Sequence, residues 1–126
     1  MPTMIFPNLP VRDLERAKSF YTALGWTLNP QFTDENAAAV VVSDEIVVML
    51  LSPGFTTQTG MSVPDGAPSA SLAVSTDSRD EVDAIFERAI AAGATPRGET
   101  EDMGFMYSRG VTDPDGHYWD FLWMDA

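Results

Sequence analysis

The chain repeats one order of elements twice: a strand, an amphipathic helix and then three strands. Residues 4–11 precede the first helical stretch and residues 69–75 precede the second. The strand-like stretches that follow are 27–32, 37–42 and 46–51 in the first half, and 94–97, 105–112 and 117–124 in the second. The letters of the two halves barely match, so the repeat is one of pattern. This order predicts an α+β fold built from two βαβββ modules, each with a helix laid on its own sheet.

Both helices carry start and stop signals in the sequence. Asp13 is a suitable N-cap for the first helix and Gly25 a suitable stop. Ser78 and Glu81 have the spacing of a capping box, and Gly93 ends the second helix. Apolar residues recur at helical spacing in both, at Leu14, Ala17, Phe20, Tyr21 and Leu24, and at Val82, Ile85, Phe86, Ala89 and Ile90. Each helix is therefore expected to bury one side against a sheet.

Residues 52–68 separate the two halves and are rich in Gly, Pro, Ser and Thr, which predicts a loop or linker. We therefore expect a single domain over 1–126, with a first module at 1–51 and a second at 69–126. The linker is either a plain connector or a flap over a cleft with Phe55 at its tip.

Composition excludes several classes of function. The 126 residues carry a net charge of −12, which repels nucleic acid and anionic lipid, so neither is an expected partner. There is no cysteine, hence no disulfide and no thiolate metal site. No apolar run approaches a membrane span, and the N-terminus lacks a signal-peptide pattern. A cytoplasmic location is expected by default.

The segment from Val111 to Trp123 predicts a strand, a tight turn at Asp113-Pro114-Asp115-Gly116 and a second strand. Asp120 lies among the aromatic residues of that second strand. A carboxylate in such a place needs a partner, water or a metal. The only histidine, His117, alternates away from Asp120 and is expected at the surface or in the turn.

Two motifs resemble the vicinal oxygen chelate superfamily, which includes glyoxalase I, the bleomycin-resistance proteins and the extradiol dioxygenases. The first is the run from Val11 to Tyr21 leading into Leu24-Gly25, and the second is the Asp-Pro-Asp-Gly turn with its strand. More narrowly, the chain resembles a bacterial branch labelled as predicted lactoylglutathione lyases. The resemblance implies that each sheet curls around a cavity. It also implies a homodimer, whose cavity lies within or between subunits.

Members of that superfamily often hold a divalent metal at four strand positions. The resemblance places these positions at Phe6, Met49, Ser71 and Asp120. Phenylalanine cannot bind a metal, a thioether is a poor ligand for hard or borderline ions, and a serine hydroxyl is weak. Asp120 alone is a good donor. We therefore expect no cofactor, and a divalent metal would meet an incomplete ligand set.

Strand alternation gives a candidate lining for an apolar cavity with a few polar groups, the usual makeup of a small-molecule site. The candidate ligand-binding residues are Phe6, Asn8, Val47, Met49, Ser71, Ala73, Tyr107, Arg109, Tyr118 and Asp120. Arg109 is the expected counter-charge of Asp120. The other face of the last strand, with Trp119, Phe121 and Trp123, is expected to pack under the helices.

Asp120 itself has two interpretations. It is either a structural carboxylate, bonded to Ser71, Asn8, a tyrosine or Arg109, or a group that orients a ligand or transfers protons. Three functions follow: a metal-free protein that binds a small, partly hydrophobic molecule, a divalent-metal-dependent lyase or isomerase similar to glyoxalase I, and a metal-independent enzyme that uses Asp120 with Tyr107 or Tyr118 for proton transfer. Whether the protein is an enzyme stays open at this point.

Overall fold

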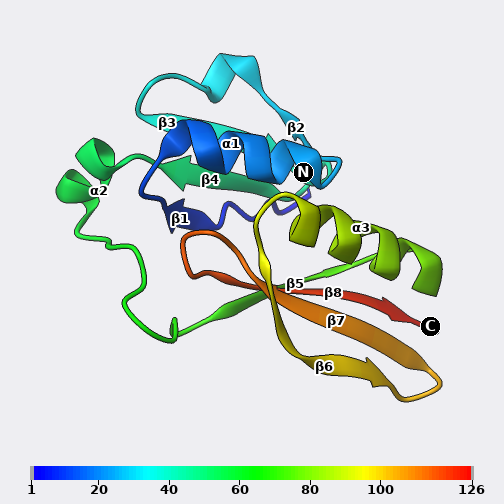
Figure 1. Ribbon diagram of the computed structural model, residues 1–126. Coiled ribbons are helices and arrows are strands. Elements are labelled where there is room, and N and C mark those ends of the chain that lie inside the picture. The colour runs from blue at the N-terminus through cyan, green and yellow to red at the C-terminus, as the bar shows by residue number, and fades with distance from the viewer. Residues whose placement is uncertain (1, 126) are drawn as a thin grey trace. The chain divides into compact units, whose positions relative to one another are not determined.

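A computed structural model describes residues 2–125 and divides the chain into two compact units, Met1–Val63 and Pro64–Ala126, here called the first and second modules. Each contains one four-stranded sheet. The two sheets have the same strand order and the same mixture of one parallel and two antiparallel pairings. The α+β fold with two βαβββ-like modules, expected from the repeat, is confirmed (Figure 1).

The first module contains β1 (Asn8–Pro10), α1 (Leu14–Ala23), β2 (Thr27–Leu28), β3 (Ala37–Val41) and β4 (Val47–Leu51), in the sheet order β1-β4-β3-β2. β1 is shorter than expected because Pro7 and Pro10 have no N–H to donate to the sheet. The strand expected at 27–32 ends at Leu28, since Pro30 begins a short 3₁₀ helix, η1 (Pro30–Phe32).

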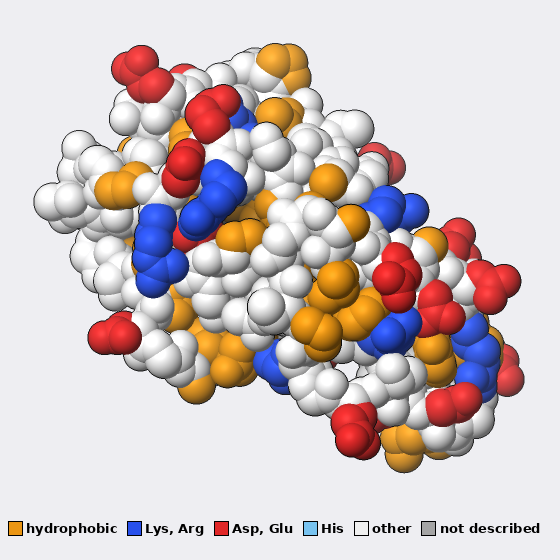
Figure 2. Space-filling view, in the orientation of Figure 1, with side chains coloured by type: hydrophobic (Ala, Val, Ile, Leu, Met, Phe, Trp, Pro, Cys, Tyr) orange, Lys and Arg blue, Asp and Glu red, His pale blue; other side chains and the backbone are white. Residues whose placement is uncertain are grey.

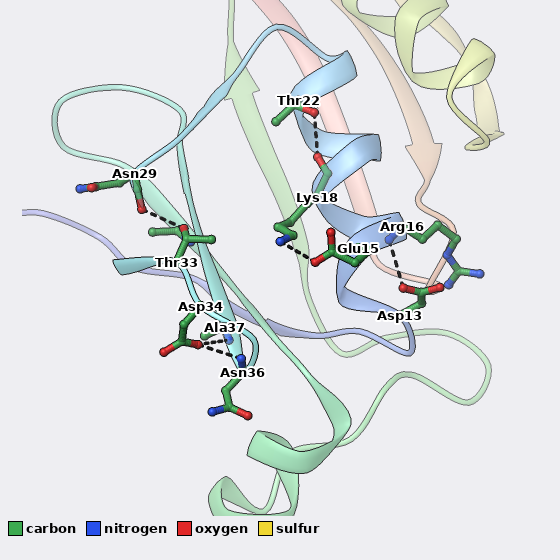
Figure 3. A network of polar contacts seen from close by, with 11 residues as sticks. Asp13, Glu15, Arg16, Lys18, Thr22, Asn29, Thr33, Asp34, Asn36 and Ala37 are labelled. Atoms are coloured by element: carbon green, nitrogen blue, oxygen red, sulfur yellow. Dashed lines mark hydrogen bonds and ion pairs between the residues drawn. The ribbon is translucent and has the colours of Figure 1, made fainter. Parts of the chain in front are cut away.

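Local hydrogen bonds fix the start of α1 and the loop after β2 (Figure 3). The Asp13 carboxylate accepts from the Arg16 backbone N–H at 3.1 Å, as an N-cap should. The Asp34 carboxylate accepts from the backbone N–H groups of Asn36, at 2.7 Å, and Ala37, at 3.1 Å, where β3 begins. These short-range contacts explain why the cap of α1 could be predicted from the sequence.

The segment expected to be a loop, residues 52–68, contains a helix, α2 (Pro53–Thr59). The expectation of a loop was wrong over residues 53–59, because the stretch holds its own helix signals. Ser52 caps the helix, since its side chain accepts from the Phe55 N–H, and Pro53 occupies the first turn, where proline is tolerated. Gly60, at φ 76°, ends it.

The second module contains β5 (Ser71–Ser75), α3 (Arg79–Ala91), β6 (Thr95–Asp102), β7 (Met106–Thr112) and β8 (Tyr118–Met124), in the sheet order β5-β8-β7-β6. β6 runs five residues beyond the end expected at Arg97. This extension could not be predicted from the sequence, because a bulge interrupts the pairing of β6 with β7 between Arg97 and Glu101.

α3 lies on one face of the second sheet, where it packs against β7 and β8 (Figure 1). The residues buried between them include Val82, Ala89, Val111, Trp119 and Phe121. Trp119 and Phe121 therefore pack under the helix as predicted, whereas Trp123 is only half-buried. No helix between residues 2 and 125 is both long and apolar enough to pass through a membrane.

Candidate functional site

The Asp113–His117 turn fixes the register of β7 against β8. The Gly116 N–H donates to the Asp113 carbonyl at 3.1 Å, and Gly116 adopts φ 99°, which glycine tolerates best. The buried Asp113 carboxylate accepts from the backbone N–H groups of Asp115, at 2.9 Å, and His117, at 2.8 Å. His117 lies in this turn, but it is buried rather than at the surface.

This register places Asp120 opposite Gly110 of β7 and beside Ala73 of β5. On the far side of Gly110, the paired residue of β6 is Arg97. The four residues form one row across the sheet. Their shared face is the one turned away from α3, because Trp119 and Phe121, which alternate with Asp120, pack against that helix.

Arg97 and Asp120 form an ion pair across this row. Arg97 Nη2 lies 2.7 Å from Asp120 Oδ1, and both side chains are about 30% exposed. The guanidinium carbon also lies 4.4 Å from the centroid of the Tyr118 ring, a cation–π contact. Arg97 Nε is buried and has no hydrogen-bond partner among residues 2–125. The pair therefore joins the two groups through one guanidinium nitrogen.

Gly110 makes the contact possible. A Cβ atom at this position would lie 2.7 Å from Asp120 Oδ1, 3.1 Å from the Arg97 carbonyl oxygen and 3.2 Å from Arg97 Nη2. Any side chain there would stand between the two charged groups. The backbone of Gly110 is not at positive φ, so glycine serves here to leave space.

The ion pair lies in a pocket of about 320 Å³ on the face of the second sheet that is turned away from α3. All four strands contribute to it, and the lining residues are Ala73, Arg97, Gly98, Glu99, Glu101, Met106, Ser108, Gly110, Asp120 and Leu122. This volume is at the lower end of small-molecule pockets, which span about 300–1,000 Å³.

Arg109 is not the counter-charge of Asp120, so that expectation was wrong. Arg109 is paired with Phe121 in the register and therefore points to the α3 face. There, Arg109 Nη1 lies 3.1 Å from Asp83 Oδ1 and 3.8 Å from Glu87 Oε1. Its guanidinium carbon lies 3.6 Å from the centroid of the Phe86 ring.

Tyr107 also lies on the α3 face and not beside Asp120. Its hydroxyl donates to Asp83 Oδ1 at 2.6 Å, and this hydrogen bond, together with burial and the Asp83 charge, raises the pKa of Tyr107. Arg79 of α3 lies over the rings of Tyr107 and Trp123. Figure 2 shows basic and acidic side chains next to one another over this part of the second module.

The remaining candidates of the second module are Ser71, Ala73 and Tyr118. Ser71 is exposed and pairs with Tyr118 in the register, so Ala73 is the β5 neighbour of Asp120. Asp120 was expected to be hydrogen-bonded to Ser71, Asn8, a tyrosine or Arg109, whereas among residues 2–125 its partner is Arg97. The sequence analysis missed Arg97 because the bulge hides its alignment with Gly110.

The first module carries the candidates Phe6, Asn8, Val47 and Met49. Phe6 is 50% exposed and precedes β1. Asn8 is paired with Met49 in the register, and its side-chain amide donates to the Phe6 carbonyl at 2.7 Å. Val47 and Met49 are half-buried and alternate with the fully buried Val48 and Leu50. The predicted face is therefore the less buried side of this sheet.

The four metal positions implied by the resemblance do not fit a divalent cation. Three of them offer a phenyl ring, a thioether and a hydroxyl. The fourth, Asp120, already accepts a hydrogen bond from a guanidinium, whose positive charge would repel a metal ion beside it. Between residues 2 and 125, no three His, Asp or Glu side chains are grouped closely enough to hold a metal.

Comparison with known proteins agrees with this architecture. The family model described as glyoxalase/bleomycin resistance protein/dioxygenase superfamily matches residues 4–121. The chain therefore belongs to this superfamily. A search among curated proteins finds no match.

Solved structures show the same fold. Hypothetical protein SA1046 from S. aureus is 24% identical, with a TM-score of 0.81 over 97% of this chain and 94% of that chain. A glyoxalase/bleomycin resistance protein/dioxygenase family enzyme from Burkholderia phytofirmans PsJN is 17% identical, with a TM-score of 0.84 over 98% of this chain and 99% of that chain. The fosfomycin resistance protein FosX from Mesorhizobium loti is 15% identical, with a TM-score of 0.73 over 97% and 92%. At these identities the likeness shows the fold alone.

Proposed function

We propose that this protein binds a small, partly hydrophobic organic molecule, without a metal, in the pocket of the second module. The observation that supports this most is the Arg97–Asp120 ion pair across Gly110. It places a positive charge directly beside Asp120, the acid that the resemblance puts at a metal position. The pocket then offers hydrogen-bonding groups and apolar contacts to an organic ligand.

The lining of the pocket supports an organic ligand. Met106, Leu122 and Ala73 supply apolar surface beside the polar Ser108 and the ion pair. Sparse polar groups in an apolar wall orient a ligand, while the apolar contacts supply much of the affinity. All of the lining residues belong to the second module.

A metal-dependent lyase or isomerase similar to glyoxalase I is the less favoured function. That reaction needs a metal to polarise the substrate oxygens, and the donor set at Phe6, Met49, Ser71 and Asp120 does not fit one. The finer likeness to predicted lactoylglutathione lyases depends on the same metal. Turnover of a glutathione hemithioacetal by the purified protein would favour the lyase function over our proposal.

A metal-independent enzyme is also less favoured. Asp120 accepts from Arg97, and the Tyr107 hydroxyl donates to Asp83 on the opposite face of the sheet. The Tyr118 ring lies against the Arg97 guanidinium. Turnover that is lost in Asp120→Asn while ligand binding persists would support this function over ours.

An NMR fragment screen tests the proposal. We expect some small aromatic molecules to shift the backbone amide signals of Gly98, Ser108 and Gly110 in a saturable way. Ala73→Phe should abolish these shifts, because Ala73 lines the pocket and a phenyl ring there would fill it. Thr95→Phe is the matched control, since Thr95 is exposed on the edge strand β6 and does not line the pocket. Hits whose shifts survive Ala73→Phe would contradict the proposal.

We also propose a homodimer, which the resemblance implies for chains of this size. Light scattering after size-exclusion chromatography should give twice the chain mass of 13.7 kDa. A mass equal to one chain at all concentrations would contradict it.

A further inference from the structure

We propose that the pocket selects an organic cation, a protonated amine or guanidine joined to a small apolar group. This inference rests on the proposed function and adds the chemical class of the ligand. The structural relationship behind it is an excess of carboxylates around a guanidinium whose charge is already paired.

The pocket lining contains one arginine and three acids: Arg97 against Asp120, Glu99 and Glu101, a net charge of 1 − 3 = −2. Arg97 contacts Asp120 at 2.7 Å, so its charge is largely balanced. Neither Glu99 nor Glu101 forms an ion pair with a cation among residues 2–125. Two carboxylates therefore remain available to a positively charged ligand.

The spacing of Arg97, Glu99 and Glu101 along β6 brings both glutamates to the pocket face. Arg97 is paired with Gly110 and Glu101 with Ser108, so three residues of β6 lie opposite the single intervening residue of β7. Gly98 adopts φ 69° within this bulge. Residues two apart in a strand share a face, so Arg97, Glu99 and Glu101 all point to the pocket. The bulge adds Gly98 to the same lining.

The rest of the lining suits an apolar group attached to the cation. Leu122 of β8 lies in the same row as Glu101 and Ser108, and Met106 of β7 lines the same pocket. Ala73 leaves room beside Asp120. Anions are disfavoured twice, by the local charge of −2 and by the net charge of −12 on the chain. A carboxylate or phosphate ligand would compete with Asp120 for Arg97 and face both glutamates.

Three probes that share one ring and differ in charge test this inference: benzylammonium, benzamide and benzoate. Each is titrated into the ¹⁵N-labelled full chain at low salt, and the amide shifts of Gly98, Ser108 and Gly110 are followed. We expect benzylammonium to bind at least about tenfold more tightly than benzoate, with benzamide between them. Raising the salt should weaken benzylammonium most, because exposed charges are screened.

A charge-matched pair of variants tests the role of the glutamates. Glu99→Gln with Glu101→Gln should weaken benzylammonium about threefold to tenfold, the size expected for two exposed charge contacts. Glu35→Gln with Glu45→Gln removes the same charge from exposed positions of the first module and should change the affinity less than about twofold. Equal losses in both pairs would overturn the local role of the two glutamates, since only the net charge would then act.

The outcomes separate the two proposals. Preference for benzylammonium that depends on Glu99 and Glu101 supports both. Binding of benzamide or benzoate as tight as that of benzylammonium overturns the cation selectivity and leaves the small-molecule site standing. Absence of pocket shifts with all three probes, and with the fragment screen, overturns the site itself.

Discussion

Arg97 and Asp120 lie on strands that do not pair with each other, yet Arg97 Nη2 is 2.7 Å from Asp120 Oδ1. Strand β7 runs between them, and its residue in this row is Gly110, which has no side chain to block the contact. The carboxylate that the resemblance would place at a metal position is thus held in an internal ion pair. The ion pair in the pocket therefore depends on Gly110 having no side chain.

Gly110→Ala should separate the pair. The added Cβ would lie 2.7 Å from Asp120 Oδ1 and 3.1 Å from the backbone oxygen of Arg97, so both the side chains and the strand must move. We expect a loss of about 1–3 kcal/mol in the free energy of unfolding, as for other overpacked positions. Denaturant titration measures it.

Gly54→Ala is the matched control for that variant. Gly54 lies in α2 with nothing within 4 Å of an added Cβ, so the change should be neutral or slightly stabilising. If Gly110→Ala proved as harmless as Gly54→Ala, the close approach described here would be wrong.

The coupling between Arg97 and Asp120 can be measured with a double-mutant cycle of Arg97→Met and Asp120→Asn. We expect a coupling energy of about 1 kcal/mol, since both side chains are partly buried. The Lys18–Glu15 pair within α1, in which the Glu15 side chain is 80% exposed, serves as the comparison and should give about 0.3–0.5 kcal/mol at most. A coupling for Arg97 and Asp120 no larger than that would argue against a structural pair.

The pKa of Tyr107 predicts a loss of stability at alkaline pH. The hydrogen bond to Asp83 raises this pKa in the folded state, so the folded protein keeps the phenol proton where the unfolded chain has lost it. The contribution is complete below the unfolded pKa of about 10 and is lost as the pH rises through the folded pKa. Tyr107→Phe should flatten the pH dependence in that window.

Asp83→Asn separates the cause from the effect. Removing the acceptor charge should lower the pKa of Tyr107 toward its ordinary value, followed by ultraviolet absorbance of the phenolate. A titration of Tyr107 that is unchanged in Asp83→Asn would refute the assignment.

The pair formed by Arg79 and Asp102 predicts an effect at acid pH. The hydrogen bond from Arg79, followed by that from the Gly104 backbone, lowers the pKa of Asp102. Its stabilising contribution is present above the unfolded pKa and is lost as the pH falls through the lower, folded value. Carboxyl ¹³C NMR should show that Arg79→Gln raises the pKa of Asp102, while Lys18→Gln in α1 leaves it unchanged.

The sequence predicted those parts of the fold that depend on near neighbours. The caps Asp13 and Ser78, the stop at Gly93 and the turn at 113–116 all act over a few residues, so their residue types indicate the structure directly. The helix α2 was missed although Ser52 and Pro53 are ordinary start signals, because the Gly- and Thr-rich composition was given more weight.

The candidate site was predicted only in part for a physical reason. Asp120 could be identified because a carboxylate in an aromatic strand is costly without a partner. The tight turn fixes Gly110 opposite Asp120, so alternation could have placed Tyr107 and Arg109 on the other face. The pairing of Arg97 with Gly110 could not be predicted in this way. It is set by the bulge between Arg97 and Glu101, and no residue pattern in the sequence marks that bulge.

The most direct test of the account is calorimetric titration of the chelator-treated protein with zinc, nickel and manganese. Since Asp120 is paired with Arg97 and the other implied positions lack good donors, we predict no saturable binding as tight as about micromolar. Binding of one ion per chain at micromolar affinity or tighter, lost in Asp120→Asn, would contradict the account.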